Sequence, residues 1–158
     1  MIIICDSSPL VALSIIDKLD LLDKLFGEVY VPLSVFGEVA LQSKPEAKRI
    51  ELWAKNKVVS STNEPLRQSF SLLLDAGESE AMALYFEKKA DYLLIDEKKG
   101  RRIATFNHIT IVGSIGILLI AKRKGYISAI APLLDKLQQS YIRMSDELYR
   151  KSLELAGE

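Results

Sequence analysis

Short apolar runs that alternate with helical patterns are the feature that most constrains the fold of this chain. The first run, Ile2-Ile3-Ile4-Cys5, is apolar at every position and β-branched at three successive ones. A strand that is apolar throughout is buried on both faces, as the strands of parallel sheets are. Alternation of such strands with amphipathic helices predicts an α/β domain, a three-layer α/β/α sandwich with a mostly parallel, Rossmann-like central sheet.

The same reading of periodicity predicts the positions of the individual elements. Strands are expected at Ile2–Cys5, Val29–Val31, Val58–Val59, Tyr92–Ile95 and Thr110–Val112. A helical pattern starts at Pro9 and continues to Leu25, where Gly27 ends it. Further helices are expected at Ser34–Leu41, Ala47–Lys55, Pro65–Leu74, Asp75–Lys89, Lys98–Thr105, Ser114–Lys124, Ile127–Gln139 and Ser145–Ala156.

Length and composition limit the class of protein. A chain of 158 residues with 49% hydrophobic residues fits a single folded domain over residues 1–158, with C-terminal helices at about 127–156. Lys+Arg and Asp+Glu both total 21, so any nucleic acid must meet a local basic patch. The longest apolar stretch, Ile109 to Ala121, is shorter than the ~18 residues that span a bilayer. One cysteine and no targeting segment predict a cytoplasmic protein without a membrane partner.

Two aspartates stand directly after the two strongest predicted strands. Asp6 follows Ile2–Cys5, and Asp96 follows Tyr92–Ile95. Ligands of open parallel sheets gather outside the carboxyl ends of the strands, so both carboxylates are expected in one cleft. Closely packed carboxylates repel one another unless a cation intervenes, and hard oxygen ligands suit Mg²⁺ or Mn²⁺. The alternative is that each aspartate only caps a helix or forms a turn.

Three glutamates are further candidates for the same cleft. Glu38 lies in an unusually apolar short helix, although a solvated helix face is the ordinary alternative. Glu78 and Glu80 lie ~200° apart on the helical wheel, so only one can face the site. Glu78 shares the inward stripe, whereas Glu80 aligns with Glu87 towards the polar side. Glu78 is therefore the better candidate, with the capping box Asp75-x-x-Glu78 as its structural alternative.

Basic residues begin immediately after Asp96. The run contains Lys98, Lys99, Arg101 and Arg102 at the expected start of a helix. Cations and a helix N-terminus both attract phosphate, which predicts RNA binding beside the acidic cleft. The alternative is a solvated helix face. Lys122-Arg123-Lys124 is a second basic group.

Four motifs, in order, resemble the PIN-domain superfamily. They are ICDSSPLVAL, YVPLSVFGEV, DAGESEAMAL and YLLIDEKKGRRIA, and the resemblance runs from Met1 to about Lys124. The chain is most similar to a branch related to toxins of the virulence-associated toxin–antitoxin systems. The family pattern places acidic residues at Asp6, Glu38, Glu78 and Asp96, with Glu80 an alternative to Glu78.

The resemblance implies a metal-dependent endoribonuclease that hydrolyses RNA phosphodiester bonds with one or two Mg²⁺ or Mn²⁺ ions, which lower the pKa of an attacking water. It also implies an antitoxin protein and a homodimer as candidate partners. Apolar C-terminal residues, including Ile130, Leu133, Leu134 and Leu137, either supply the dimer surface or cover the core.

Other α/β enzymes fit the sequence less well. A dehalogenase-type phosphatase needs a second aspartate where Ser8 stands, and a receiver domain needs one where Ser60-Ser61 follows the predicted middle strand. The serious alternative is a catalytically inactive PIN-like module that binds RNA or protein.

Overall fold

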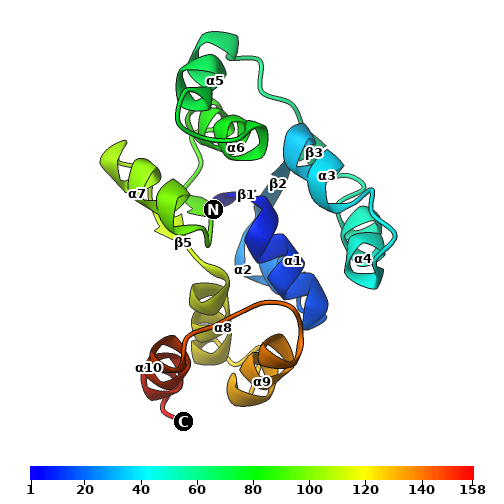
Figure 1. The fold of residues 1–158 in the computed structure, drawn as a ribbon, viewed down its shortest axis with the longest axis vertical. Coiled ribbons are helices and arrows are strands. Elements are labelled where there is room, and N and C mark those ends of the chain that lie inside the picture. Colours follow the sequence, from blue (N-terminus) through cyan, green and yellow to red (C-terminus); the bar gives the residue numbers. More distant parts are fainter.

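A five-stranded parallel sheet forms the centre of the molecule, in a computed structural model that describes residues 1–158 (Figure 1). The strand order is β3-β2-β1-β4-β5, and every neighbouring pair is parallel. The strands are β1 (Ile2–Cys5), β2 (Glu28–Pro32), β3 (Val58–Val59), β4 (Tyr92–Leu94) and β5 (Ile111–Val112). The predicted parallel α/β fold is confirmed.

Helices cover both faces of the sheet and make the predicted three layers. One core packs Ile3, Cys5 and Leu94 against α1, α2, α8 and α9, and the other packs Ile4 and Leu93 against α6. Successive residues of β1 thus point into opposite cores, which explains why every position of this strand is apolar. The helices are α1 (Ser7–Ile15), α2 (Asp20–Leu25), α3 (Leu33–Val39), α4 (Pro45–Trp53), α5 (Glu64–Ser71), α6 (Ala76–Glu87), α7 (Lys98–Phe106), α8 (Ser114–Arg123), α9 (Ala131–Gln139) and α10 (Asp146–Ala156).

The chain reverses its direction of travel across the sheet between β1 and β4. After β1 it continues to β2 and β3 on one side, and it then returns to β4 and β5 on the other. Ligands of open α/β sheets bind at such a switch point, outside the carboxyl ends of the strands. The topology therefore predicts a ligand site at the residues that follow β1 and β4.

The helix predicted from Pro9 to Leu25 is interrupted, which corrects the sequence analysis. α1 ends at Ile15, and Asp17 adopts a left-handed conformation with φ of 56°. The amide of Lys18 then donates to the carbonyl of Leu13 at 2.8 Å, a bond that closes the helix end. The apolar spacing continues across the break because α2 packs on the same core.

The C-terminal helices cover the core. Ile130, Leu134 and Leu137 are buried in it, so they do not supply the free surface that was considered for a homodimer. The homodimer itself stays a prediction. None of the helices combines the length and the apolar character needed to cross a bilayer.

Candidate active site

The two strand-end aspartates lie at the switch point. β1 pairs with β4 so that Cys5 stands beside Leu94, and the amide of Asp6 donates to the carbonyl of Leu94 at 2.9 Å. Asp6 and Asp96 thus leave neighbouring strands at nearly the same level of the sheet edge. This adjacency follows from parallel pairing, as the sequence analysis expected.

Asp6 carries the strongest electrostatic signal of the site. It is only 3% exposed, and although it occupies the N-cap position of α1, its side chain makes no capping hydrogen bond. Burial raises the pKa of Asp6 to about 7, and the charges of Asp75, Glu38 and Asp96 raise it further, while the Ser7 amide lowers it. A carboxylate that is buried among other carboxylates marks a place where a cation would be stabilised.

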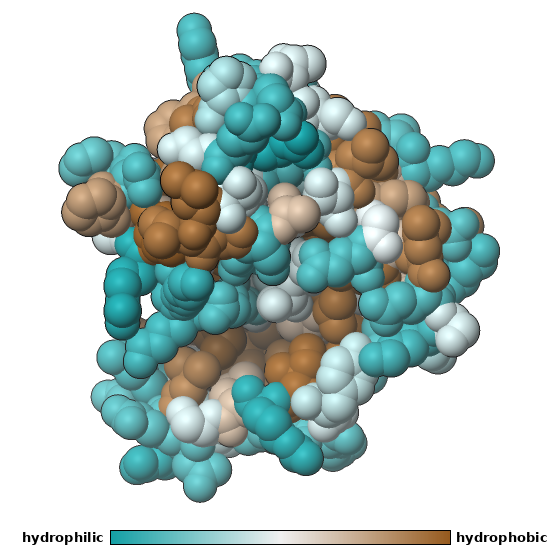
Figure 2. All heavy atoms as spheres, turned by 45° about the horizontal axis from the view of Figure 1, so that its top comes forward, coloured by the Kyte–Doolittle hydropathy of each residue, from teal (hydrophilic) through white to brown (hydrophobic).

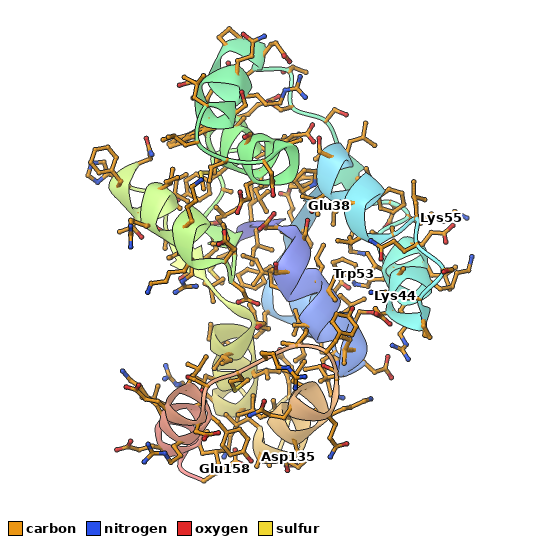
Figure 3. All side chains as sticks on the ribbon, in the orientation of Figure 1. Glu38, Lys44, Trp53, Lys55, Asp135 and Glu158 are labelled. Carbon is orange, nitrogen blue, oxygen red and sulfur yellow. The ribbon has the colours of Figure 1, made fainter.

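Glu38 faces the same region from α3. The Ser7 hydroxyl at the start of α1 donates to Glu38 Oε2 at 2.8 Å, and Figure 3 shows Glu38 between α3 and α1. A methyl group added at Gly77 would lie 2.9 Å from Glu38 Oε2 and 3.6 Å from Asp75 Oδ1. The absence of a side chain at Gly77 therefore leaves room for the carboxylates of α3 and of the start of α6 to approach one another.

Asp75 is the site residue that the sequence analysis missed. It is the N-cap of α6, and its Oδ1 accepts from the amide of Glu78 at 2.9 Å in a complete capping box. Its charge is nevertheless the largest carboxylate contribution to the raised pKa of Asp6. The sequence signal was the Asp75-x-x-Glu78 motif, which was considered only as an explanation for Glu78.

Glu78 lies at the side of the site that faces α7. Its Oε2 accepts from the amide of Asp75 at 3.3 Å, and a methyl group at Gly100 of α7 would lie 3.0 Å from its Oε1. Burial and the charge of Asp75 raise the pKa of Glu78 to about 7, and Asp6 and a contact with Glu97 act in the same direction. Glu78 therefore serves the capping box and also belongs to the acidic group.

Glu80 points away from the acidic group, and the prediction that it lies on the polar side of its helix is wrong. It is buried, its Oε2 accepts from the amide of Ser34 at 2.7 Å, and its Oε1 accepts from the amide of Ser61 at 3.0 Å. α6 is buried from Gly77 through Leu84, so its first turns have no solvent face. Because both oxygens bind backbone amides, Glu80 serves as a tether between segments, and Glu78 is the candidate ligand on this helix.

Asp96 is oriented by the first residue of α8. The Ser114 amide and hydroxyl each donate to one of its oxygens at 2.8 Å. A methyl group at Gly113 would lie 2.8 Å from Asp96 Oδ1 and 3.1 Å from Arg101 Nη1, so Arg101 lies beside this carboxylate. Asp96 is thus held at the N-terminus of α8, with the guanidinium group of Arg101 nearby.

The basic residues of α7 divide into two kinds. Lys98, Lys99 and Arg102 are exposed, whereas Arg101 is half-buried and donates from Nη1 to the carbonyl of Ile95 at 2.8 Å. The exposed three are available to phosphate, and Arg101 stabilises the end of β4.

Two residues with reactive side chains lie outside the site. Cys5 is fully buried, and burial raises the pKa of its thiol, which keeps it an uncharged core residue. His108 is in a turn with φ of 59° after α7.

Two of the acidic residues, Glu38 and Asp96, open onto a cavity of about 530 Å³, whose walls also include Ser7 and Ser114. As the side chains stand, no three of the chain's His, Cys, Asp and Glu residues are arranged to hold a metal ion. The donor set is nevertheless made only of carboxylate and hydroxyl oxygens, which are ligands that Mg²⁺ and Mn²⁺ prefer. By their donor chemistry Asp6, Glu38, Asp75 and Asp96 suit such an ion, with Glu78 adjoining them.

Comparison with known proteins identifies the family of the chain. A family model described as a PIN domain matches residues 2–158. No curated protein and no solved structure matches the chain. Because the family match covers nearly the whole chain and the fold is the expected parallel α/β sandwich, this protein belongs to the PIN-domain family, whose members are generally nucleases.

Proposed function

We propose that this protein is a metal-dependent endoribonuclease that hydrolyses phosphodiester bonds in RNA. The observation that carries the proposal is the burial of Asp6 among Asp75, Glu38 and Asp96, which raises the pKa of Asp6 to about 7. Carboxylates gathered in this way are destabilised when all are ionised, and a divalent cation removes that cost. PIN domains generally use Mg²⁺ or Mn²⁺, which is consistent with the oxygen-only donor set.

Each acidic residue has a defined part in the proposed site. Asp6, Glu38, Asp75 and Asp96 would hold the cation, with Glu78 as the candidate ligand from α6, and the cation when bound acts as a Lewis acid towards phosphate and water. Ser7 orients Glu38, and Ser114 orients Asp96, through the hydrogen bonds described above. These bonds restrict the rotation of the two carboxylates.

The exposed cations beside the site support a polyanionic substrate. Lys98 and Lys99 begin α7, where the helix N-terminus also attracts anions. Because Asp96 precedes this turn by two residues, a phosphate held by α7 lies beside the carboxylates. RNA as the particular substrate comes from the resemblance to the toxin branch of the family.

The experiment is cleavage of labelled RNA and DNA oligonucleotides with Mg²⁺, with Mn²⁺ and with EDTA. We expect metal-dependent RNA products that Asp6→Asn abolishes, because the amide keeps the size of the side chain but not the charge that holds the cation. Asp17→Asn is the matched control, since it removes a carboxylate from a left-handed turn that asparagine tolerates. Equal cleavage by Asp6→Asn and wild type would reject this site.

The alternative function is an inactive PIN-like module that binds RNA or protein. The observation in its favour is that the described side chains form no closed metal-ligand group. It predicts RNA binding that is equal with and without metal, and no products at any metal concentration.

The resemblance extends the proposal to the toxin of a toxin–antitoxin pair. Induced expression in a bacterial host should then arrest growth, and Asp6→Asn should not. Co-expression of an antitoxin from a neighbouring gene should restore growth. If cells that contain active wild-type enzyme grow normally, the toxin role is rejected and the ribonuclease proposal is unaffected.

A further inference from the structure

The cavity at the acidic site extends well beyond the carboxylates. Besides Glu38 and Asp96, its lining is mainly apolar and includes Val11 of α1, Ile115 of α8 and Leu148 of α10. Its volume of about 530 Å³ lies within the range of ~300–1,000 Å³ that is usual for ligand sites. The lower half of Figure 2 shows a hollow over this part of the molecule, with apolar residues inside it and hydrophilic residues on its rim.

This cavity is called the groove here, and one of its walls is formed by Ile142, Arg143 and Met144. They belong to the segment Ser140–Ser145, which joins α9 to α10 and is called the strap here. Figure 1 shows it as the orange-brown loop that crosses in front of α8 between α10 and α9. At one end the Tyr141 hydroxyl donates to Glu46 at 2.6 Å, and Lys44 lies 4.5 Å from the centroid of its ring. At the other end the Ser145 hydroxyl caps α10 by accepting from the amide of Leu148 at 3.1 Å.

Arg143 lies at the middle of the strap and lines the groove. It is exposed, and its side chain forms no hydrogen bond or ion pair within the chain. It is also the only basic residue of the groove. A cation without a protein partner, held on the wall of a groove that opens onto carboxylates, is available to an anionic group of a ligand.

We propose that this groove binds the nucleotide next to the cleaved bond, with Arg143 binding a neighbouring phosphate of the strand. The inference rests on the proposed function, which puts the reacting phosphate at the carboxylates. From there an RNA strand presents an apolar base face and sugar and then another phosphate, and the groove offers an acidic, an apolar and a cationic wall to these three groups. Arginine is well suited to the phosphate because its guanidinium can donate two parallel hydrogen bonds.

Substrate length tests this assignment in the full-length protein with Mg²⁺. Arg143→Ala should lower kcat/KM for an octaribonucleotide about tenfold, mainly through KM, because a charge-assisted contact is lost. It should leave cleavage of a dinucleoside monophosphate unchanged, since that substrate has no second phosphate. Arg150→Ala is the matched control, because Arg150 is exposed on α10 outside the groove and should change neither rate.

A second pair of variants tests the apolar wall. Leu148→Glu puts a carboxylate into the groove at a residue that is 44% exposed, and Leu155→Glu makes the same change on α10 outside the groove, at a residue that is 64% exposed. Leu148→Glu should weaken binding of the octaribonucleotide at least tenfold, and Leu155→Glu should leave it unchanged. If both variants bind like wild type, the groove does not seat the strand.

Binding and cleavage separate the two proposals. In the Asp6→Asn background, fluorescence anisotropy should show that Arg143→Ala lowers the slope of log Kd against log salt by about 0.7, as loss of one single-strand phosphate contact does. If wild type cleaves no RNA but this effect is present, the nuclease proposal fails, and the groove with Arg143 stands as a binding site for single-stranded RNA. Equal binding and equal slopes for Arg143→Ala and Arg150→Ala would overturn the groove assignment, whether or not RNA is cleaved.

Discussion

Glu80 Oε2 accepts a hydrogen bond of 2.7 Å from the backbone amide of Ser34, and this bond ties α6 to the first turn of α3. The other oxygen of Glu80 holds the amide of Ser61 on the connection that follows β3. Since α3 carries Glu38, the buried Glu80 sets the position of one candidate ligand without belonging to the ligand group itself.

Glu80→Gln should therefore weaken the metal site as well as the fold. The amide leaves one of the two backbone donors without an acceptor, which costs about 1–3 kcal/mol of unfolding free energy. Whichever way the amide group turns, the Ser34 amide loses its ionised acceptor, so the start of α3 is held less tightly, and we expect Mn²⁺ affinity, measured by calorimetry, to fall at least several-fold.

Glu87→Gln is the control for this tether. Glu87 accepts from the Ser61 and Thr62 hydroxyls on the same connection but makes no bond to α3. It should lower stability and leave Mn²⁺ affinity unchanged. Wild-type affinity in Glu80→Gln would show that the tether serves the fold alone.

Substitution of Gly77 should move Glu38 while leaving α6 intact. In Gly77→Ala the new methyl group would lie 2.9 Å from Glu38 Oε2 and 3.2 Å from Val35 Cγ2, so the flexible carboxylate must shift. We expect at least a tenfold loss of kcat/KM on RNA. The unfolding temperature should change little, because alanine is otherwise favoured over glycine in a helix by ~1 kcal/mol.

Gly37→Ala is the matched change on α3, where an added methyl group meets no atom within 4 Å. It should stabilise the protein by about 0.5–1 kcal/mol and keep full activity. Full activity in Gly77→Ala would mean that the position of the Glu38 carboxylate does not matter for cleavage.

Stability should depend on pH through Asp6 when no divalent cation is present. The folded state raises its pKa from 3.8 to about 7, so the folded protein binds this proton more tightly than the unfolded chain does. Unfolding free energy therefore falls as pH rises from about 4 to about 7, by on the order of 2–4 kcal/mol for a shift of this size.

Asp6→Asn should remove the part of the pH dependence that comes from Asp6, leave the part that comes from the raised pKa of Glu78, and be more stable than wild type at pH 8 in EDTA. Urea denaturation at pH 5 and pH 8 measures the difference, and Mg²⁺ should restore wild-type stability at pH 8. A wild-type protein that becomes more stable between pH 5 and pH 8 in EDTA would contradict the electrostatic description of the site.

The exposed lysines of α7 should contribute to RNA affinity through phosphate contacts. Replacing both Lys98 and Lys99 by alanine should weaken binding of single-stranded RNA. It should also lower the slope of log Kd against log salt by about 1.4, that is about 0.7 for each contact. The control removes the same charge at Arg123 and Lys124, which are exposed on α8 and beyond it. Equal salt slopes for the two double variants would show that α7 has no special part in binding.

Much of the fold could be predicted because its signals are local. Apolarity at every position of Ile2–Cys5 identifies a strand buried on both faces, and helical spacing identifies the helices around it. The adjacency of Asp6 and Asp96 was also accessible, because parallel strands with right-handed crossovers bring their carboxyl ends to one edge. Sequence alone therefore determined the parallel α/β architecture and the edge at which the acidic residues gather.

The roles of individual acidic residues depended on partners that are distant in sequence. Glu80 binds amides 46 and 19 residues away, and these long-range bonds make a buried position suitable for a charge that the helical wheel assigned to solvent. The local sequence predicts only that Asp75 caps a helix. Asp75 is a neighbour of Asp6 and Glu38 because β1 and α3 pack close to it in the tertiary structure. A local pattern reports which residues share a face, whereas the field at a carboxylate is the sum over every charge and amide that tertiary packing brings near it. For that reason only the tertiary structure separated the tether from the candidate ligands.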